Sequence, residues 1–223
     1  MKILIAGGAG EIGKYLIKDL SNQGHEVAVI DRAPEAQEME KLPVAYFQGN
    51  LVDKELVNGI VQGMDVIINL AWSFADDPHT IFGGDIKGHL HLLEAASSSG
   101  VKHFIYTSTA TVYGSAVLHP VKETHPCLIA DARKPLYALG KFTAEELCRF
   151  YGKERGLPVT IFRFWWAFGE NIGGRHLRDL IRKSLNHQAL EMVRGGRNVC
   201  YNERSGQSHH ISDRSIHRIR ADL

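Results

Sequence analysis

The chain has 223 residues, a mass of 24.8 kDa and a formal net charge of +1, with 26 Lys and Arg against 25 Asp and Glu. That length suits one α/β domain, and 44% hydrophobic with 23% charged residues is typical of a protein with a buried core. The balanced charge argues against nucleic acid or an anionic membrane as partner, and no apolar run approaches the ~20 residues that span a bilayer. Cys127, Cys148 and Cys200 form no CxxC pair, so we expect free thiols and a reducing, cytoplasmic setting.

Short apolar runs alternate with stretches of helical periodicity along most of the chain. We expect six strands, at Lys2–Ala6, Glu26–Ile30, Val44–Phe47, Asp65–Leu70, His103–Tyr106 and Val159–Phe164. We expect helices between them, notably at Ile12–Gly24, Leu51–Gln62, Phe82–Ser98 and Tyr137–Arg155. This alternation predicts an α/β fold, a doubly wound (Rossmann) parallel sheet with helices on both faces.

A glycine-rich turn follows the first strand and opens the first helix. Gly7, Gly10 and Gly13 have the spacing GxxGxxG, with Glu11 and Ile12 between the last two glycines. Glycine permits a tight turn and a close approach of backbone to a pyrophosphate, and the helix N-terminus offers unpaired N–H groups to the phosphates. The turn therefore predicts a nucleotide-binding site.

The acid at the end of the second strand selects between nucleotides. Asp31 follows Gly13 by 18 residues, and a carboxylate there can accept hydrogen bonds from both adenosine ribose hydroxyls. It would also repel a 2′-phosphate, which favours NAD over NADP. Arg32 beside it weakens that preference, because a guanidinium could pair with a 2′-phosphate.

Tyr137 and Lys141 form a YxxxK pair in a predicted helix. Residues four apart share a helix face, so the phenol and the ammonium can converge on one ligand. An ordinary tyrosine, with a pKa of about 10, is a poor base at neutral pH. We expect the ammonium and a positive nicotinamide to lower the pKa of Tyr137, so that it can exchange a proton with a substrate hydroxyl. Hydroxyl residues at the end of the fifth strand lie where open α/β sheets bind ligands.

Together these motifs resemble the extended short-chain dehydrogenases/reductases, specifically the NAD-dependent epimerase/dehydratase family, which includes the nucleotide-sugar 4-epimerases. The resemblance covers roughly Met1–Gly169. Besides the glycine turn and Asp31, it rests on TSTATVYG at Thr107–Gly114 and on YALGKFTAEEL at Tyr137–Leu147. It implies a small-molecule substrate, a nucleotide sugar or related hydroxylated compound. It also implies a homodimer built on the helices Phe82–Ser98 and Tyr137–Arg155.

The resemblance also implies roles for individual residues. Thr109, Tyr137 and Lys141 would be the catalytic triad, with Ser108 beside it and Trp166 further along as substrate contacts. Cofactor contacts are implied at or just after the ends of the third, fourth and sixth strands, and from the triad. They are Asn50, Leu51, Leu70, Ala71, Trp72, Phe164, Tyr137 and Lys141. In the implied mechanism Tyr137 removes a proton from a substrate hydroxyl while hydride moves from the same carbon to the nicotinamide.

Two positions depart from the family pattern, and the family's chains usually continue beyond Leu223. Trp166 replaces a usual asparagine, and Gly206 stands where an arginine often binds the substrate diphosphate. We expect an NAD-binding Rossmann domain over residues 1–194. Residues 195–223, poor in large apolar side chains, are expected to be an incomplete substrate-lobe segment or a mobile tail, so that this lobe is reduced or missing. Two alternatives stay open: a non-catalytic NAD-binding or regulatory protein, and a dehydrogenase or reductase for a smaller alcohol or ketone.

Four further side chains carry structural expectations. Glu145 and Glu146 are expected to make surface ion pairs. Cys148 is expected to be a packed thiol, and Trp165 to pack in the core at a strand end. No metal site is expected.

Overall fold

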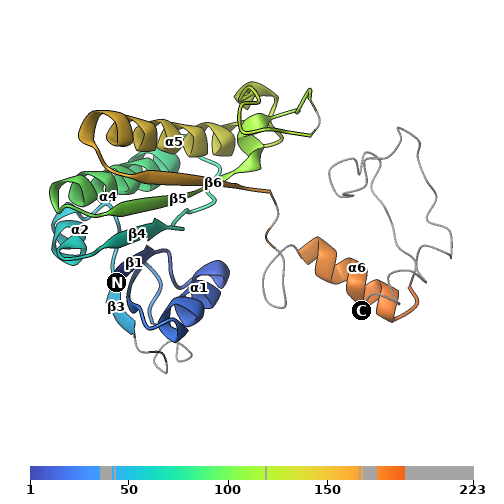
Figure 1. The fold of residues 1–223 in the computed structure, drawn as a ribbon. Coiled ribbons are helices and arrows are strands. Elements are labelled where there is room, and N and C mark those ends of the chain that lie inside the picture. Colours follow the sequence, from blue (N-terminus) through green and yellow to red (C-terminus); the bar gives the residue numbers. More distant parts are fainter. Residues whose placement is uncertain (36–41, 43, 119, 166, 168–174, 189–223) are drawn as a thin grey trace. The chain divides into compact units, whose positions relative to one another are not determined.

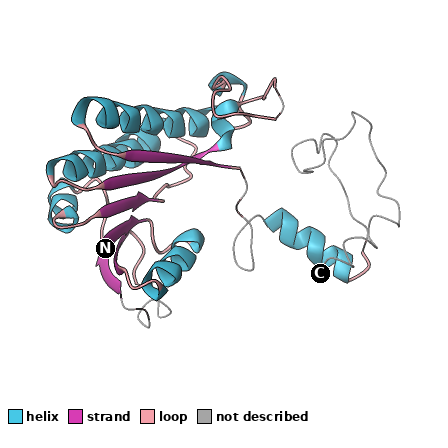
Figure 2. Ribbon diagram, in the orientation of Figure 1, coloured by secondary structure: helices cyan, strands magenta, loops and turns pink. Residues whose placement is uncertain are grey.

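Six parallel strands form one sheet in the order β3-β2-β1-β4-β5-β6 in the computed structural model of the chain (Figure 1, Figure 2). This order confirms the predicted doubly wound sheet. The chain winds outward from β1 to β3, returns to β4 beside β1, and winds outward again to β6. The structure describes residues 1–35, 42, 44–118, 120–165, 167 and 175–188.

The elements follow the predicted succession. The strands are β1 (Lys2–Ala6), β2 (Glu26–Asp31), β3 (Val44–Gln48), β4 (Val66–Asn69), β5 (His103–Thr109) and β6 (Val159–Phe164). The helices are α1 (Glu11–Asn22), α2 (Lys54–Val61), α3 (Pro78–Thr80), α4 (Lys87–Ser98), α5 (Pro135–Arg155) and α6 (Arg175–Leu185). Shorter helical turns are η1 (Ile81–Ile86), η2 (Ala110–Tyr113) and η3 (Ile129–Asp131). Strand β5 continues past its predicted end and includes the hydroxyl residues that follow Tyr106.

Two hydrophobic cores cover the two faces of the sheet. One face, with Leu4 and Phe104, packs against α2, α4 and α5. The other, with Ile5 and Val29, packs against Ile17 of α1 (Figure 1). A parallel sheet is buried on both faces, which explains why the strands are continuous apolar runs in the sequence.

A polar side chain ties three elements together inside the first core. The buried ring of His89, on α4, accepts a hydrogen bond at Nδ1 from Asn69 Nδ2 (2.9 Å) and donates one from Nε2 to the Ala144 carbonyl (3.1 Å). Burial lowers the pKa of His89 to about 3, so the ring is neutral. Cys148 of α5 lies against the same ring and is fully buried, which confirms the packed thiol.

The chain divides into two compact units, Met1–Gly173 and Gly174–Leu223. In the second unit, Leu180, Ile181 and Leu185 of α6 have the spacing of one helix face. The predicted domain boundary at 194/195 lies outside the described residues and stays a prediction. Among the described residues, no helix is long and apolar enough to cross a membrane.

The turn between β1 and α1 needs glycine for two different reasons. Gly7 has a φ of +80°, and a Cβ there would lie 2.6 Å from the Ala71 nitrogen. Gly13 has no such backbone constraint, but a Cβ on it would lie 2.4 Å from the Gly8 carbonyl oxygen. The first turn of α1 can therefore pack on the preceding loop only without a side chain at Gly13.

We expect Gly13→Ala to lower the free energy of unfolding by about 1–3 kcal/mol, because the new methyl group meets backbone that cannot move aside. Gly59→Ala is the matched control. Gly59 lies within α2 with nothing within 4 Å of an added Cβ, so alanine should stabilise the chain by about 0.5–1 kcal/mol. Urea unfolding of the two variants measures both changes. Equal shifts would contradict the close packing of α1 on the turn.

Candidate functional site

The carboxyl ends of the strands meet along one edge of the sheet, where doubly wound folds bind ligands. The glycine turn follows β1, and Asp31 ends β2. The segment Leu70–Trp72 follows β4, and Thr109 ends β5. Most of the residues singled out in the sequence are therefore brought to this one edge.

The N-terminus of α1 is left without a side-chain cap. Gly10 is the N-cap residue, and no side chain caps the helix there. Backbone bonds shape the turn: the Gly7 N–H donates to the Ile30 carbonyl (2.9 Å) and the Gly10 N–H to the Gly7 carbonyl (3.3 Å). Glu11 and Ile12 are the first helical residues after the cap. A turn with this close backbone, at the positive end of a helix dipole, fits a diphosphate.

Asp31 lies against the glycine turn. Its Oδ2 accepts a hydrogen bond from the Ala9 N–H (3.0 Å), and its Oδ1 accepts one from the Ala33 N–H (3.0 Å). Two backbone donors thus fix the carboxylate beside the turn, the position expected for an acceptor of ribose hydroxyls. Arg32 is exposed next to it.

Two predicted cofactor contacts follow β3. Asn50 is exposed, and its Oδ1 accepts a hydrogen bond from the Val52 N–H (3.2 Å). The Leu51 carbonyl bonds to the Nδ1 of His91 on α4 (3.0 Å), which fixes the loop after Asn50. Their contact with a cofactor stays a prediction.

The segment after β4 lies between the glycine turn and α5. The Leu70 N–H donates to the Ala6 carbonyl (2.8 Å), and Ala71 is the residue that a Cβ on Gly7 would meet. Trp72 comes next and packs on α5, where its ring lies edge-on to the Tyr137 ring, with centroids 6.0 Å apart. The backbone of this segment therefore connects the turn to the predicted catalytic helix.

Helix α5 carries the YxxxK pair in its first turns. It begins at Pro135, whose fixed φ suits a first helical position, and ends before Gly156, which has a φ of +69°. Across from it, the Thr109 hydroxyl accepts a hydrogen bond from the Thr111 N–H (3.2 Å) and caps η2. Tyr137 is half-buried, and its phenol lies close enough to the Thr109 side chain for that hydroxyl to lower its pKa. The structure thus brings the predicted Thr109 and Tyr137 together.

Burial, and not the YxxxK spacing, controls the titration of the pair. Burial raises the pKa of Tyr137 above 10.0, and the Thr109 side chain only opposes this. The lowered pKa expected from a nearby ammonium is therefore absent in this structure. The Lys141 ammonium instead donates to the Thr107 carbonyl (2.8 Å) and lies 4.3 Å from the centre of the Trp72 ring.

Lys141 is almost fully buried. Burial lowers its pKa to about 7, although the negative charges of Asp85 and Glu145 act to raise it. A lysine with this pKa is half-charged at neutral pH, so small changes around it alter its charge.

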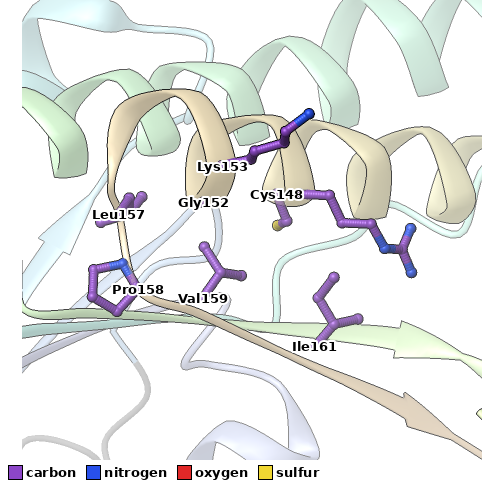
Figure 3. Close-up of a pocket in the computed structure, with 8 residues that line it drawn as sticks. Cys148, Gly152, Lys153, Leu157, Pro158, Val159 and Ile161 are labelled. Carbon is purple, nitrogen blue, oxygen red and sulfur yellow. The ribbon is translucent and has the colours of Figure 1, made fainter.

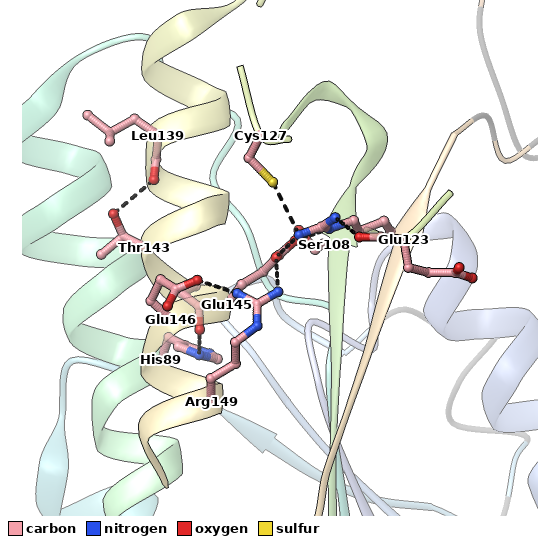
Figure 4. Close-up of polar contacts among 11 residues, drawn as sticks. His89, Ser108, Glu123, Cys127, Leu139, Thr143, Glu145, Glu146 and Arg149 are labelled. Carbon is pink, nitrogen blue, oxygen red and sulfur yellow. Dashed lines mark hydrogen bonds and ion pairs between the residues drawn. The ribbon is translucent and has the colours of Figure 1, made fainter. Parts of the chain in front are cut away.

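Glu145 corrects one expectation from the sequence. It was expected at the surface, yet its side chain is fully buried and accepts hydrogen bonds from three side chains (Figure 4). Ser108 Oγ donates at 2.5 Å, Arg163 donates from Nε (2.9 Å) and Nη2 (2.6 Å), and Arg149 donates from Nη2 (2.8 Å). Glu146 does lie at the surface, paired with Arg149. The spacing in the sequence places Glu145 on the helix face of Lys141, but it does not show that this face is buried.

The guanidinium of Arg163 connects the Glu145 hydrogen bonds to the loop before α5. It lies 4.7 Å from the centre of the Tyr113 ring and donates to Cys127 Sγ (3.4 Å) and to the Glu123 carbonyl (3.5 Å). Burial raises the pKa of Glu145, but the hydrogen bonds from Arg163 and Ser108 outweigh it, so the net pKa lies below the ordinary value. Glu145 is therefore an ionised carboxylate held by cations.

Ser108 and Thr109 are adjacent but have different partners. The Ser108 side chain is buried and donates to Glu145, while the Thr109 hydroxyl lies at Tyr137. Successive residues of a strand point to opposite faces, which separates the two hydroxyls. The substrate contact predicted for Ser108 stays a prediction, and its hydroxyl already has an acceptor.

The end of β6 corrects a second expectation. Phe164 pairs with Thr109 across the sheet and is partly exposed. Trp165 was expected in the core, but it is 51% exposed and stacks on Tyr113, with ring centroids 6.1 Å apart. Because β6 is the edge strand and ends at Phe164, no element covers Trp165 on its outer side within the described part of the chain. The predicted positions Trp166 and Gly206 lie outside the described residues.

A cavity of about 340 Å³ lies at the other end of α5 (Figure 3). Cys148, Gly152 and Lys153 of α5 line it together with Val159 and Ile161 from the start of β6. The cavity lies at the amino-terminal end of β6, whereas Tyr137 lies at the carboxyl ends of the strands. It is therefore no part of the candidate site.

Three residues of the site escaped the sequence argument: Phe74, Asp85 and Glu145. Phe74 stacks on the Tyr137 ring, and Asp85 binds Ser73 in the segment after β4. Only Glu145 left a readable signal, because it follows Lys141 by four residues and Tyr137 by eight and so shares their helix face. The other two depend on a loop conformation that periodicity does not encode.

Comparison with known proteins gives a family match along most of the chain. The family model described as NAD dependent epimerase/dehydratase family matches residues 3–200. A UDP-glucose 4-epimerase of Erwinia amylovora is 32% identical over 195 residues, which cover 80% of this chain and 57% of that protein. A UDP-glucuronic acid decarboxylase 1 of Danio rerio is 30% identical over 210 residues, 87% of this chain and 49% of that protein. The chain thus spans about half the length of these curated relatives.

Solved structures resemble the same part of the chain. A UDP-glucose 4-epimerase of Thermotoga maritima with UDP-glucose has a TM-score of 0.71 and 25% identity, covering 88% of this chain and 67% of that one. A short-chain dehydrogenase/reductase superfamily protein of Agrobacterium tumefaciens with bound NAD has a TM-score of 0.65 and 28% identity, covering 74% and 49%.

We expect Glu145→Gln to lower the free energy of unfolding by about 3 kcal/mol at pH 7, because Arg163 loses its buried counter-charge. Glu146→Gln is the control on the same helix. Its side chain is 54% exposed, and its pair with Arg149 should contribute less than about 1 kcal/mol. The pKa of Glu145 is lowered in the folded chain, so its contribution is present above the ordinary carboxyl pKa of 4.5 and is lost as pH falls below it. Urea unfolding at pH 7 and pH 4 should therefore show the gap between the two variants narrowing in acid. A gap that is the same at both pH values would contradict the ionised, buried carboxylate.

Lys141→Met should reveal the depressed lysine pKa as a pH-dependent stability. Between about pH 7 and the ordinary lysine value of 10.5, the unfolded chain binds more protons than the folded one, so wild-type stability rises with pH. Relative to the variant, the wild type should gain on the order of 2 kcal/mol between pH 7 and pH 9. Lys153→Met, at the exposed end of the same helix, controls for loss of a lysine. Urea unfolding across this range gives the slope, and a constant difference would argue that Lys141 titrates normally.

Proposed function

The chain belongs to the NAD dependent epimerase/dehydratase family, and from this premise we propose that it is an NAD-dependent oxidoreductase of the epimerase/dehydratase type that acts on a nucleotide sugar. One observation carries the proposal: Thr109 and Tyr137 meet at the edge of the sheet that also holds the glycine turn and Asp31. The relatives are named as enzymes of UDP-sugars, which supports a UDP-hexose as the substrate class.

The residues present fit a dinucleotide. The glycine turn and the uncapped N-terminus of α1 would hold its diphosphate, because glycine at Gly7 and Gly13 lets the turn pack closely on Ala71 and Gly8 and brings backbone N–H groups to the helix end. Asp31 would accept the adenosine ribose hydroxyls and would repel a 2′-phosphate, which favours NAD. When bound, NAD supplies the hydride acceptor and a positive charge on its oxidised ring.

The chain's own groups would handle the proton. In this structure Tyr137 has a raised pKa, so its phenol carries a proton at neutral pH. A positive charge close to the ring favours the phenolate, which would let Tyr137 take the proton of a substrate hydroxyl. Thr109, beside Tyr137, would orient the same hydroxyl, and Lys141 would add positive charge from the next turn of α5. For an epimerase, Tyr137 would return the proton after hydride returns to the other face of the carbon.

Two further expectations remain part of the proposal. A cytoplasmic setting is supported by Cys127 and Cys148, which are both free thiols. A homodimer built on α4 and α5 is implied by the family resemblance.

Titration calorimetry with NADH and NADPH, followed by turnover of UDP-glucose, tests the proposal. We expect NADH to bind at least about tenfold more tightly than NADPH, because Asp31 repels a 2′-phosphate. Tyr137→Phe should keep its NADH affinity and lose about 100-fold in turnover, because the proton acceptor is gone. Tyr151→Phe, at the other end of α5, is the control and should behave as wild type.

The outcomes separate the possible functions. Failure to bind either nucleotide would exclude the proposed site. Tight NADH binding without turnover of any sugar nucleotide would favour a non-catalytic NAD-binding protein. Turnover restricted to small alcohols or ketones would favour a simple dehydrogenase. Unchanged turnover in Tyr137→Phe would refute the role of the phenol.

A further inference from the structure

A strained aromatic residue lies beside the candidate catalytic tyrosine. Phe74 has a φ of +57°, a conformation that costs energy for a bulky side chain. The residue is 72% exposed, so burial does not offset that cost. Strained backbone of this kind persists where neighbouring contacts hold it, and it concentrates at functional sites. We call Trp72–Ala75 the aromatic strap.

Asp85 fixes the strap in place. Its Oδ1 accepts a hydrogen bond from the Ser73 N–H (2.9 Å), and its Oδ2 accepts one from the Ser73 hydroxyl (2.6 Å). The Ala75 N–H in turn donates to Ser73 Oγ (3.2 Å). Asp85 belongs to η1, a π-helical turn, and such turns are frequent at functional sites. Ser73 is thus bonded directly to the carboxylate, and Ala75 is held through the Ser73 hydroxyl.

Trp72 anchors the other end of the strap on α5. The ammonium of Lys141 lies over its ring, and Gly140 leaves room for it. A Cβ on Gly140 would lie 3.0 Å from Trp72 Cζ2 and 2.6 Å from a methyl group of Ile81. Glycine within the YxxxK motif therefore lets the indole approach the helix.

Phe74 presents an open face beside the Tyr137 phenol. The two rings are nearly parallel, with an interplanar angle of 19° and centroids 6.0 Å apart, while Trp72 meets Tyr137 edge-on. A centroid distance of 6.0 Å makes the stack an offset one, so much of the Phe74 ring stays uncovered, as its exposure shows. A ligand group that reaches the Tyr137 hydroxyl along this side lies next to that ring.

We propose that Phe74 is a specificity-determining residue, whose exposed ring receives the C–H face of the pyranose whose hydroxyl Tyr137 contacts. The inference rests on the proposed function and identifies the pyranose as the part of the substrate that the aromatic strap contacts. The face of an aromatic ring is electron-rich and attracts the slightly positive hydrogens of C–H groups. A pyranose offers such hydrogens on one face, whereas a nucleoside diphosphate without a sugar offers none at this position. Phe74 therefore contributes to binding of the sugar and not of the nucleotide.

Calorimetric titration with UDP-glucose and with UDP, on the full chain saturated with NADH, tests this assignment. Phe74→Ala and Phe74→Gly should weaken UDP-glucose binding roughly five- to tenfold and change UDP binding less than about twofold. NADH affinity should be unchanged in both variants. Phe150→Ala is the control, since Phe150 is 48% exposed in the C-terminal half of α5. Phe74→Gly should also melt at a higher temperature than Phe74→Ala, because glycine tolerates a positive φ.

Each outcome decides the assignment. Equal weakening of UDP-glucose and UDP, or no weakening of either, would overturn it. A wild-type chain that binds NADH but binds UDP-glucose no more tightly than UDP would overturn it as well, with the nucleotide site intact. If the wild-type chain does not bind NADH, the proposed function itself fails. The role proposed for Phe74 is then excluded too, because it depends on that function.

Discussion

The buried carboxylate of Glu145 holds the parts of the candidate site in register. It lies on α5, and its donors come from β5, from β6 and from α5 itself. Ser108 and Arg163 are paired across the two strands, so one carboxylate ties both strands to the helix that carries Tyr137 and Lys141. A buried charge without these partners would destabilise the fold by several kcal/mol. That penalty makes the arrangement all-or-none: the helix either sits where Glu145 meets its cations or packs poorly.

The loop before α5 depends on the same interaction. Arg163, oriented by Glu145, contacts the Tyr113 ring, the Glu123 carbonyl and the Cys127 sulfur. These contacts hold the loop that leads into α5, and Tyr137 lies only two residues inside that helix. The Glu145–Arg163 ion pair therefore supports both the helix that carries Tyr137 and the loop that precedes it.

Burial sets the chemistry of the site as strongly as charge does. It raises the pKa of Tyr137, lowers that of Lys141 to about 7 and keeps His89 neutral. Without a cofactor, Tyr137 is therefore protonated and Lys141 is about half-charged at neutral pH, so both would respond to a positive charge brought in by a cofactor. The contacts of the Tyr137 ring with Trp72 and Phe74 add to the burial that raises its pKa.

The amino-acid sequence by itself determined the succession of strands and helices, the glycine turn, Asp31 and the YxxxK spacing. These are local features: strand periodicity, the φ of Gly7 and the helix face shared by Tyr137 and Lys141 all follow from residues close along the chain. The tertiary structure alone decided that Glu145 is buried while Glu146 is exposed, that Trp165 lies outside the core, that Phe74 is strained and that burial dominates the titration of Tyr137. Each of these depends on which atoms far apart in the chain come into contact, because desolvation and close packing are properties of the folded environment and not of a residue and its neighbours in sequence.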